Sequence, residues 1–449
     1  MSTPNLVRHP DTRSPKVMTT RAWWLVGLNF LIPGSAQLLA GSRRFGRFAV
    51  STTFILWVLV VVAGVTYLLA PTIVYSIATN PIGLTVAQAL LLGFAILWVA
   101  TTLDTLRLVR LVRTFPAARV AVAVLSVVLL VLSAGTAAYG AYVSGVARGA
   151  ISGIFDAGEI EPPVDGRYNI LLLGGDAGPD RLGLRPDSIS VASVDAATGA
   201  TTIIGVPRNL EHIPFAEGSP LYGPCPNGYD CGDECLISYL YTYGQEHPDL
   251  YPASIAAGSS PGIEAMRDAV SGALGMTLQY YVLIDMQGFS DLIDSLGGIT
   301  IDVKTRQPVG GGEDSLGRPT GVGRWIEPGI QKMDGFTALW YTRARHGTND
   351  YDRMARQREV QEAILTQFQP ANVLTKFEAV AEAGAQVVTT DIPAGMLGPF
   401  VDLATKSREA PITRVELVPP TINPARPDFA VIHAIVDAAI TPVTASPSP

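Results

Sequence analysis

The sequence predicts an α/β domain anchored to a membrane by a preceding helical transmembrane region. The hydrophobic fraction is 48%, and the excess lies in the first 150 of 449 residues. Those residues hold twelve Lys and Arg against two acidic residues, whereas the remainder holds twenty against thirty-seven. In the acidic remainder, strand-like and helix-like patterns alternate. This alternation predicts an α/β/α sandwich with a mixed central sheet.

Three apolar stretches in the basic part are long enough to cross about 30 Å of hydrocarbon as helices. They are Phe48–Ala70, Ile82–Leu103 and Arg119–Val143. Arginines precede the first stretch and separate the second from the third, whereas the Pro71–Pro81 loop is uncharged. The positive-inside rule places the arginine loops in the cytoplasm and the uncharged loop outside. We therefore expect a multi-pass protein of the cell membrane with an extracellular C-terminal domain.

An earlier apolar segment, Trp23–Ala40, is shorter and is interrupted by Pro33-Gly34. Arginines lie on both sides of it, at Arg21 and Arg43, so both ends favour the cytoplasm. Two alternatives remain: a re-entrant hairpin that turns at Pro33-Gly34, or one exception to the charge rule. We expect no cleavable signal peptide, because a charged tail of about twenty residues precedes the segment.

These patterns divide the chain into six parts. They are a cytoplasmic tail (1–22), a transmembrane region of three to four segments (23–143), a linker (144–166), the main α/β domain (167–370), a C-terminal part of the extracellular domain (371–440) and a disordered tail (441–449) rich in Pro, Ser and Thr.

Hydrophobic periodicity sets the expected elements of the α/β domain. The expected strands are Tyr168–Gly174, the hairpin arms Asp187–Asp195 and Thr201–Val206, Tyr280–Asp285 and Ile299–Val303. The expected helices are Ser260–Leu274, Met286–Leu296, Gly329–Leu339 and Asp350–Phe368. We expect a further strand after the helix that ends at Leu339, with Arg343 and Arg345 at the end of that strand.

The three cysteines, Cys225, Cys231 and Cys235, lie in one loop rich in Gly, Pro and Asp. An extracellular location favours one disulfide and one odd thiol. Three free thiols, or a zinc site completed by Asp230, Asp233 or His247, are the alternatives.

Arginines concentrate in one stretch of this acidic chain, with five between residues 343 and 358. On a strand, Arg343 and Arg345 would share a face. On the following helix, Arg353, Arg356 and Gln357 share a face. Guanidinium groups at a helix N-terminus suit a doubly anionic ligand such as a pyrophosphate. The alternative is a solvated helix with surface ion pairs to Asp350, Asp352 and Glu359.

Two carboxylates are the candidate metal ligands. Asp176 follows the first strand, and Asp187 begins the next one, two residues after Arg185. Carboxylate, water and phosphate oxygens suit Mg²⁺ or Mn²⁺. Arg208 ends the hairpin and would point toward the same place. The alternative for each aspartate is a turn-capping role.

These residues carry a resemblance to a known family. Asn169–Asp176, Arg185-Pro-Asp-Ser188, Val206-Pro-Arg-Asn209, Tyr281–Val303 and, most specifically, Gly329–Gln357 together resemble the LytR-CpsA-Psr family. Where this family usually has Pro-Arg-Asp and Arg-Ser/Thr-Asp, the chain has Pro207-Arg208-Asn209 and Arg185-Pro186-Asp187. The first departure removes a carboxylate that could pair with Arg208.

The resemblance implies an enzyme that transfers a glycopolymer phosphate from a polyprenyl-pyrophosphate carrier to a peptidoglycan hydroxyl in the wall of Gram-positive bacteria. It implies that Asp176 and Asp187 hold Mg²⁺ or Mn²⁺. It also implies that one set of residues surrounds the pyrophosphate: Arg185, Arg208, Arg343, Arg345, Arg353, Arg356 and Gln357.

The chemistry needs charge neutralisation and in-line positioning more than covalent help. Asp350, or a metal-bound aspartate, is the candidate base for the acceptor hydroxyl. The carrier needs an apolar groove, which the helices at Met286–Leu296 and Asp350–Phe368 would wall. A pyrophosphatase using water remains an alternative. A non-enzymatic transcriptional attenuator is a weaker one, because no nucleic-acid-binding motif is present and no nucleic-acid partner is expected.

Overall fold

The computed structural model describes residues 7–155, 160–175, 186–232, 235–313, 319–344, 349–367 and 388–441. The chain divides into two compact units, residues 1–149 and 150–449. Each unit is described by itself.

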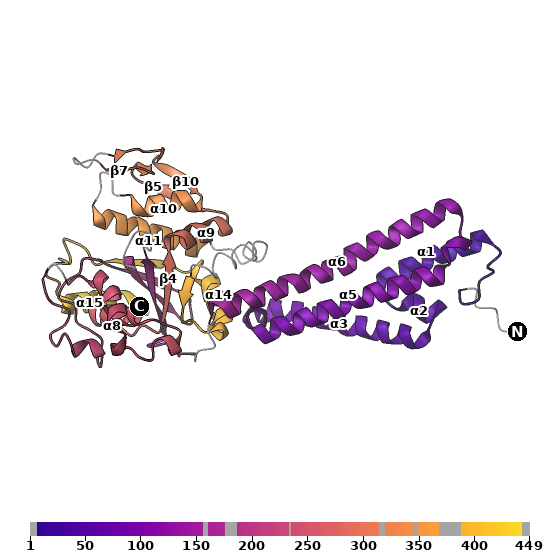
Figure 1. The fold of residues 1–449 in the computed structure, drawn as a ribbon, viewed down its shortest axis with the longest axis horizontal. Coiled ribbons are helices and arrows are strands. Elements are labelled where there is room, and N and C mark those ends of the chain that lie inside the picture. The colour runs from indigo at the N-terminus through magenta and orange to yellow at the C-terminus, as the bar shows by residue number, and fades with distance from the viewer. Residues whose placement is uncertain are drawn as a thin grey trace, which may run out of the picture. The chain divides into compact units, whose positions relative to one another are not determined.

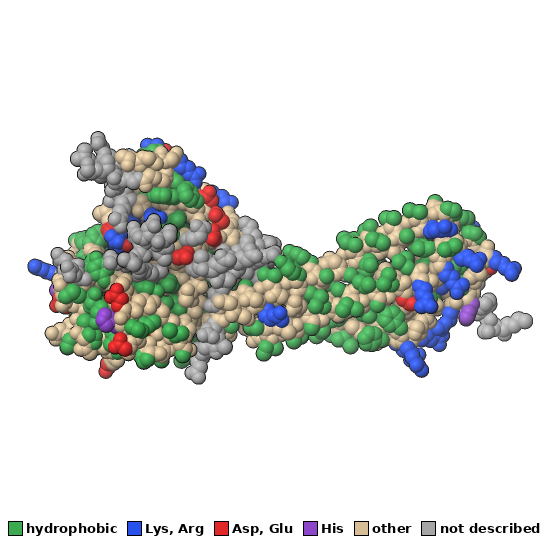
Figure 2. Space-filling view, viewed as in Figure 1, with side chains coloured by type: hydrophobic (Ala, Val, Ile, Leu, Met, Phe, Trp, Pro, Cys, Tyr) green, Lys and Arg blue, Asp and Glu red, His purple; other side chains and the backbone are tan. Residues whose placement is uncertain are grey.

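The first unit is helical (Figure 1). Its helices are α1 (Pro15–Leu31), α2 (Ser35–Ala40), α3 (Arg43–Leu69), α4 (Pro71–Ala78), α5 (Pro81–Val109) and α6 (Pro116–Ile154), with a 3₁₀ turn at Leu111–Arg113. Within the described residues, three stretches are long and apolar enough to cross a membrane: Arg43–Leu69, Pro81–Arg113 and Pro116–Gly153. They contain the three predicted spans, apart from Ala70 at the end of the first. Apolar side chains cover much of the visible surface of these helices, and blue basic side chains gather near the end that carries the N-terminus (Figure 2).

The predicted interruption at Pro33-Gly34 is confirmed, because α1 ends at Leu31 and α2 starts at Ser35. Gly34 has a φ of 98°, and a Cβ there would lie 2.6 Å from the Cβ of Ala49. Polar side chains hold this hairpin to α5: the Gln37 amide donates to the Thr101 carbonyl at 2.9 Å. The side of the membrane on which the hairpin lies stays a prediction. The helix α4, inside the uncharged loop, was not predicted.

The second unit is built on a six-stranded mixed sheet with the order β11-β4-β1-β2-β3-β12. The strands are β1 (Arg167–Gly175), β2 (Pro186–Asp195), β3 (Thr201–Val206), β4 (Tyr280–Asp285), β11 (Val388–Thr390) and β12 (Ile412–Glu416). The predicted hairpin is confirmed, since β2 runs antiparallel to both β1 and β3. β4 is parallel to β1, and β12 is parallel to β3. The predicted mixed sheet is thus confirmed.

One face of the sheet carries the main hydrophobic core. Alternate residues such as Leu171 on β1, Val191 on β2 and Ile204 on β3 are fully buried there. They pack against α7 (Leu240–Glu246), α8 (Pro261–Leu274) and α15 (Phe429–Ile440). Short 3₁₀ turns at Pro220–Tyr222, Ile237–Tyr239, Pro248–Leu250 and Ile255–Ala257 fold the cysteine-containing loop over this side. In that loop Cys231 and Cys235 form a disulfide and Cys225 is free, which confirms the prediction of one disulfide and one odd thiol and adds the pairing that the sequence left open.

The opposite face is covered by α9 (Met286–Leu296), α10 (Gly335–Arg343), α11 (Asp350–Gln367) and α14 (Leu397–Ser407), which follows a 3₁₀ turn at Ala394–Met396. A second small core lies beneath α9, α10 and α11. It includes two-stranded sheets formed by β5 (Ile299–Val303) with β10 (Gly329–Met333), and by β6 (Gln307–Val309) with β9 (Arg324–Ile326). A third pair joins β7 (Gly312–Glu313) to β8 (Pro319–Thr320).

The structure corrects several predicted boundaries. Gly329–Met333 is a strand rather than part of a helix, and Arg343 ends the helix α10 rather than a strand. The motif Asp334-Gly335 causes this switch: the Asp334 side chain caps α10 by accepting from the Thr337 N–H at 2.8 Å. The predicted linker 144–166 is helical up to Ile154.

Beyond the expected boundary at residue 370, β11 and β12 belong to the same sheet as β1, so the C-terminal part of the expected extracellular domain completes the main sheet. Strands as short as β11 and β12 have weak hydrophobic patterns. These patterns do not reveal that the two strands form the edges of a sheet whose other strands lie much earlier in the chain. Phe368 and most of the expected tail, residues 442–449, lie outside the described residues.

Candidate functional site

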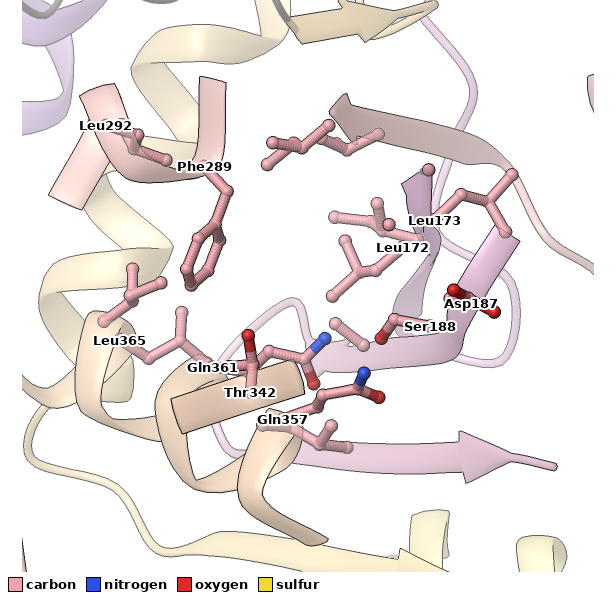
Figure 3. Close-up of a pocket in the computed structure, with 18 of the residues that line it drawn as sticks. Leu172, Leu173, Asp187, Ser188, Phe289, Leu292, Thr342, Gln357, Gln361 and Leu365 are labelled. Atoms are coloured by element: carbon pink, nitrogen blue, oxygen red, sulfur yellow. The ribbon is translucent and has the colours of Figure 1, made fainter. Parts of the chain in front are cut away.

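A cavity of about 780 Å³ lies between the second face of the sheet and the helices that cover it. Strands β1 to β4 form one wall, and α9, α10, α11 and α14 form the others. Figure 3 shows Phe289 and Leu292 of α9 across the cavity from Leu172 of β1. The predicted apolar groove walled by α9 and α11 is therefore present, with Ile364 and Leu365 contributed by α11.

Charged residues gather at one end of this cavity, where β1 and β3 end and β2 begins. Arg208 donates to Asp187 Oδ1 at 2.5 Å through Nη1 and to Asp350 Oδ2 at 3.1 Å through Nε. Arg353 donates to the same oxygen of Asp350 at 3.3 Å. The structure thus brings together four of the residues predicted for the site, from β2, the loop after β3 and the first turn of α11.

The burial of these four groups differs. The side chain of Arg353 is only 4% exposed, whereas those of Arg208 and Asp187 are each 31% exposed. Burial by itself would lower the pKa of Arg208, but the adjacent carboxylates of Asp187 and Asp350 outweigh it and raise that pKa. Arg208 therefore stays a cation at any physiological pH. Asp187 and Asp350 supply the carboxylate partners that Asn209 cannot.

Arg343 lines the same cavity from the last turn of α10. Its guanidinium lies 5.7 Å from the centre of the Trp340 ring, and its side chain is exposed. Among the described residues it makes no hydrogen bond or ion pair, in contrast to Arg208. A guanidinium placed in this way is available to an incoming anion.

The cavity lining changes from charged to apolar along α11. Arg353, Gln357, Gln361 and Ile364 all line it and follow one another at helical spacing. Gln361 donates to Ser190 Oγ on β2 at 2.9 Å, while its own Oε1 is buried and has no hydrogen-bond partner among the described residues. An anionic group fits one end of this gradient and an apolar chain fits the other.

Two arginines of the cluster have structural roles instead. Arg356 donates through Nε to the Tyr341 carbonyl at 3.1 Å and through Nη2 to the Ala344 carbonyl, so it fixes the end of α10 beside α11. Burial lowers its pKa. Arg358 forms an ion pair with Glu416 of β12 and lies against Gly205 of β3. Arg356 is thus directed at backbone carbonyls, and it is absent from the described cavity lining, contrary to the grouping predicted from helix spacing.

Asp176, Arg185 and Arg345 lie outside the described residues. Within the described ranges, no group of three or more His, Cys, Asp or Glu could by itself hold a metal ion. Asp187 nevertheless offers a carboxylate at the charged end of the cavity, and carboxylate oxygens are suitable ligands for Mg²⁺. One of its two oxygens is already shared with Arg208. The donor chemistry fits a metal held jointly with phosphate oxygens.

Some lining residues were not singled out in the sequence. They are Ser188, Gln361 and Thr342, together with Phe400, Leu403, Ala404 and Ser407 of α14. The spacing of Gln361, four residues after Gln357, was the available signal. α14 gave none, because its residues lie beyond the expected end of the domain.

The fold and the cavity define a class of protein: a membrane-anchored α/β domain whose cavity suits a ligand with an anionic head and an apolar chain. The LytR_cpsA_psr family matches residues 149–423, which is more than half of the chain. The protein therefore belongs to the LytR-CpsA-Psr family.

Relatives within this family carry different names. The chain is 24% identical over 227 residues to a polyisoprenyl-teichoic acid–peptidoglycan teichoic acid transferase, TagU, of Halalkalibacterium halodurans, covering 50% of this chain and 61% of the relative. It is 27% identical over 231 residues to biofilm regulatory protein A of Streptococcus mutans, covering half of each. Among solved structures, TagV of B. subtilis matches with a TM-score of 0.41 and 18% identity, over 62% of this chain and 96% of that one. The chain thus spans about half to three-fifths of the length of the two curated relatives, TagU and biofilm regulatory protein A.

Proposed function

We propose that the protein transfers a glycopolymer phosphate from a polyprenyl-pyrophosphate carrier to a hydroxyl of peptidoglycan. The observation that carries this proposal is the cavity whose lining holds three arginines at one end and is mainly apolar along the rest. A prenyl chain fits the apolar part, and the pyrophosphate fits beside Arg208, Arg343 and Arg353. The names of relatives such as TagU support glycan transfer as the class of reaction.

In the proposed reaction the acceptor oxygen attacks the phosphorus that bears the glycan. A phosphorus–oxygen bond forms there, and the bond to the carrier phosphate breaks, so that the prenyl monophosphate leaves. Asp350, held beside Arg208 and Arg353, accepts the proton of the acceptor hydroxyl. Arg208, Arg343 and Arg353 stabilise the negative charge that grows on the leaving phosphate.

A divalent ion belongs to this proposal. Asp187, with Asp176 as its expected partner, would hold Mg²⁺ or Mn²⁺ together with phosphate oxygens. The ion would offset phosphate charge while the leaving group departs. Removal of divalent ions with EDTA, or Asp187→Ala, should lower turnover by orders of magnitude without unfolding the protein. Unchanged turnover in both cases would refute the metal.

The decisive test uses the full chain in nanodiscs with a synthetic glycosyl pyrophosphoryl lipid and a soluble peptidoglycan fragment. We expect release of prenyl monophosphate together with glycan attached to the fragment. Arg343→Ala should weaken binding of a fluorescent polyprenyl phosphate strongly. The matched control Arg306→Ala should not, because Arg306 is exposed and pairs with Glu327 away from the cavity.

Three outcomes contradict the proposal in different ways. Equal loss in both arginine variants would indicate diffuse charge attraction rather than a phosphate site. Release of free glycan phosphate at the same rate with and without the fragment would identify a pyrophosphatase. Saturable binding without any turnover would favour the regulatory role suggested by the names of some relatives.

The proposed location is the cell membrane, with three spans and the second unit outside. The supporting observations are the three apolar helices of the first unit and the arginines near the end of that first unit that carries the N-terminus (Figure 2). A reporter fused after Ser144 should therefore report outside, and reporters at Met1 and Arg110 inside. Labelling of Met1 from outside intact cells would exclude a re-entrant α1–α2 hairpin.

A further inference from the structure

The end of the cavity opposite the arginines is formed by α14. Phe400, Leu403, Ala404 and Ser407 line this end, on one face of that helix. On the sheet they are met by residues at the far ends of the strands, such as Val194 and Thr201, which pair with each other across β2 and β3. The lining of α14 is apolar apart from Ser407.

Close contacts fix α14 in place. Ser407 Oγ donates to the Gly199 carbonyl at 2.6 Å and lies 3.1 Å from Thr201 Oγ1. A Cβ on Gly199, which has a φ of 75°, would lie 2.8 Å from the Ser407 nitrogen. The helix and the β2–β3 turn are therefore in direct backbone contact, which leaves little room for a ligand chain to pass between them.

The start of α14 is packed by aromatic rings. Phe400 meets Tyr168 edge-on, with ring centroids 5.3 Å apart, and meets Tyr280 at 5.8 Å. Both ends of the helix are thus held against the sheet. We expect such a wall to keep its position when the cavity is filled.

The distance between the arginines and α14 follows from two elements that line the whole cavity. On β2 the lining extends from Asp187 to Val194, or about 23 Å at the rise of an extended strand. On α11 it extends from Arg353 to Leu365, or about 18 Å at the rise of an α-helix. A straight ligand can therefore extend roughly 20 Å from its phosphates before it reaches α14.

We propose that α14 sets the length of prenyl chain that the cavity takes, with Ala404 as the residue at which this length is decided. The inference rests on the proposed function, because it assumes a prenyl pyrophosphate as the ligand. Carbon–carbon bonds of about 1.5 Å in a zigzag chain advance roughly 1.25 Å each, so about 20 Å corresponds to about four prenyl units. Longer chains gain no further contact with the described lining and must leave the cavity before α14.

The test measures binding of prenyl pyrophosphates with two, three, four and five prenyl units to the full chain in nanodiscs, with empty nanodiscs to subtract partitioning. For the unaltered protein, affinity should rise up to about four units and then level off. Ala404→Trp should leave the two-unit ligand within twofold and weaken the four-unit ligand at least tenfold. Ala404→Leu, a smaller change that endangers folding less, should weaken the four-unit ligand to a lesser degree.

Lys406→Trp is the matched control, because Lys406 lies on the same helix, is exposed and does not line the cavity. It should leave all four affinities unchanged. Equal weakening of short and long ligands by Ala404→Trp and Ala404→Leu, or equal effects of the Ala404 and Lys406 variants, would overturn the role of α14 while the proposed function stands. Failure of the unaltered protein to bind any prenyl pyrophosphate would instead overturn the proposed function itself and this inference with it.

Discussion

The two faces of the central sheet are made by alternate residues of the same strands, yet they end in opposite environments. Leu171 of β1 points into the main core and is fully buried, whereas its neighbour Leu172 points into the cavity. The first face is closed by α7, α8 and α15. The second is covered by helices that leave a volume of about 780 Å³ between themselves and the strands.

This difference separates stability from binding. Side chains on the closed face contact protein atoms and contribute to the free energy of folding. Side chains on the cavity face expose apolar surface that an apolar ligand would cover. Burial of this surface therefore contributes to the free energy of binding rather than to that of folding. The comparison predicts that substitutions at neighbouring residues differ in their cost to stability and in whether they weaken ligand binding.

The largest expected effect is at the charged end of the cavity. Arg208→Ala should lower transferase turnover by about 10³-fold, because it removes a cation from the phosphate site and leaves Asp187 and Asp350 without their shared partner. Arg208→Lys keeps the charge but cannot bridge two carboxylates with the same geometry, so it should recover only part of the activity. Turnover is measured with the synthetic lipid donor. Full activity of Arg208→Ala would show that the charged cluster serves the fold and not the reaction.

The next prediction concerns the neighbouring leucines of β1. Leu171→Ala should lower the free energy of unfolding by about 2–5 kcal/mol, since it opens a hole in a closed core. Leu172→Ala should cost about 1 kcal/mol or less, because the same truncation only enlarges an existing cavity. Leu172→Ala should instead weaken binding of a prenyl pyrophosphate. Thermal and denaturant unfolding of the two variants provide the comparison, and equal losses of stability would mean that the two faces are equally packed.

Filling the cavity from the sheet gives a third, smaller effect. Ala192→Leu on β2 adds three carbons toward the cavity and should change the free energy of unfolding by less than about 1 kcal/mol. The same substitution at Ala269 of α8, which is fully buried on the closed face, should destabilise by about 1–3 kcal/mol through overpacking. Only Ala192→Leu should also weaken binding of the prenyl ligand. Strong destabilisation by Ala192→Leu would indicate that the space at this position is already filled.

Much of the sheet could be predicted, because its signals are local. The hairpin of β2 and β3, the pair β4–α9 and the long helix α11 follow from hydrophobic periodicity with nearly the observed bounds. The end of the domain could not be found in this way. The strand β12 contributes five residues to the sheet. Among the described strands it pairs only with β3, which ends some two hundred residues earlier in the chain, and this pairing alone identifies it as part of the sheet.

The site was predicted in part for a similar reason. Helix spacing places Arg353, Arg356 and Gln357 on one side of α11, but spacing does not distinguish a cavity from a neighbouring backbone. Arg353 and Gln357 line the cavity, whereas Arg356 bonds the end of α10. Arg343 was expected on a strand that follows a helix at Gly329–Leu339, whereas α10 begins at Gly335 and continues to Arg343. The capping residue Asp334 is a local signal that would have corrected the start of this helix, but not its end.

The smallest expected effect tests the polar residue inside the apolar part of the cavity. Gln361 has one buried amide oxygen without a hydrogen-bond partner among the described residues, so replacing the amide by a thioether of similar shape removes an uncompensated polar group. The same change also removes the hydrogen bond to Ser190, which destabilises the protein. The two effects on the free energy of unfolding therefore oppose each other. Gln361→Met should therefore change the free energy of unfolding by about 0.5 kcal/mol or less, and should tighten binding of a four-unit prenyl pyrophosphate a few-fold. Gln245→Met, away from the cavity, is the matched control for the substitution itself. Weaker binding in Gln361→Met would mean that the amide contacts a polar part of the ligand, and that the phosphates lie deeper in the cavity than Arg208 and Arg353 suggest.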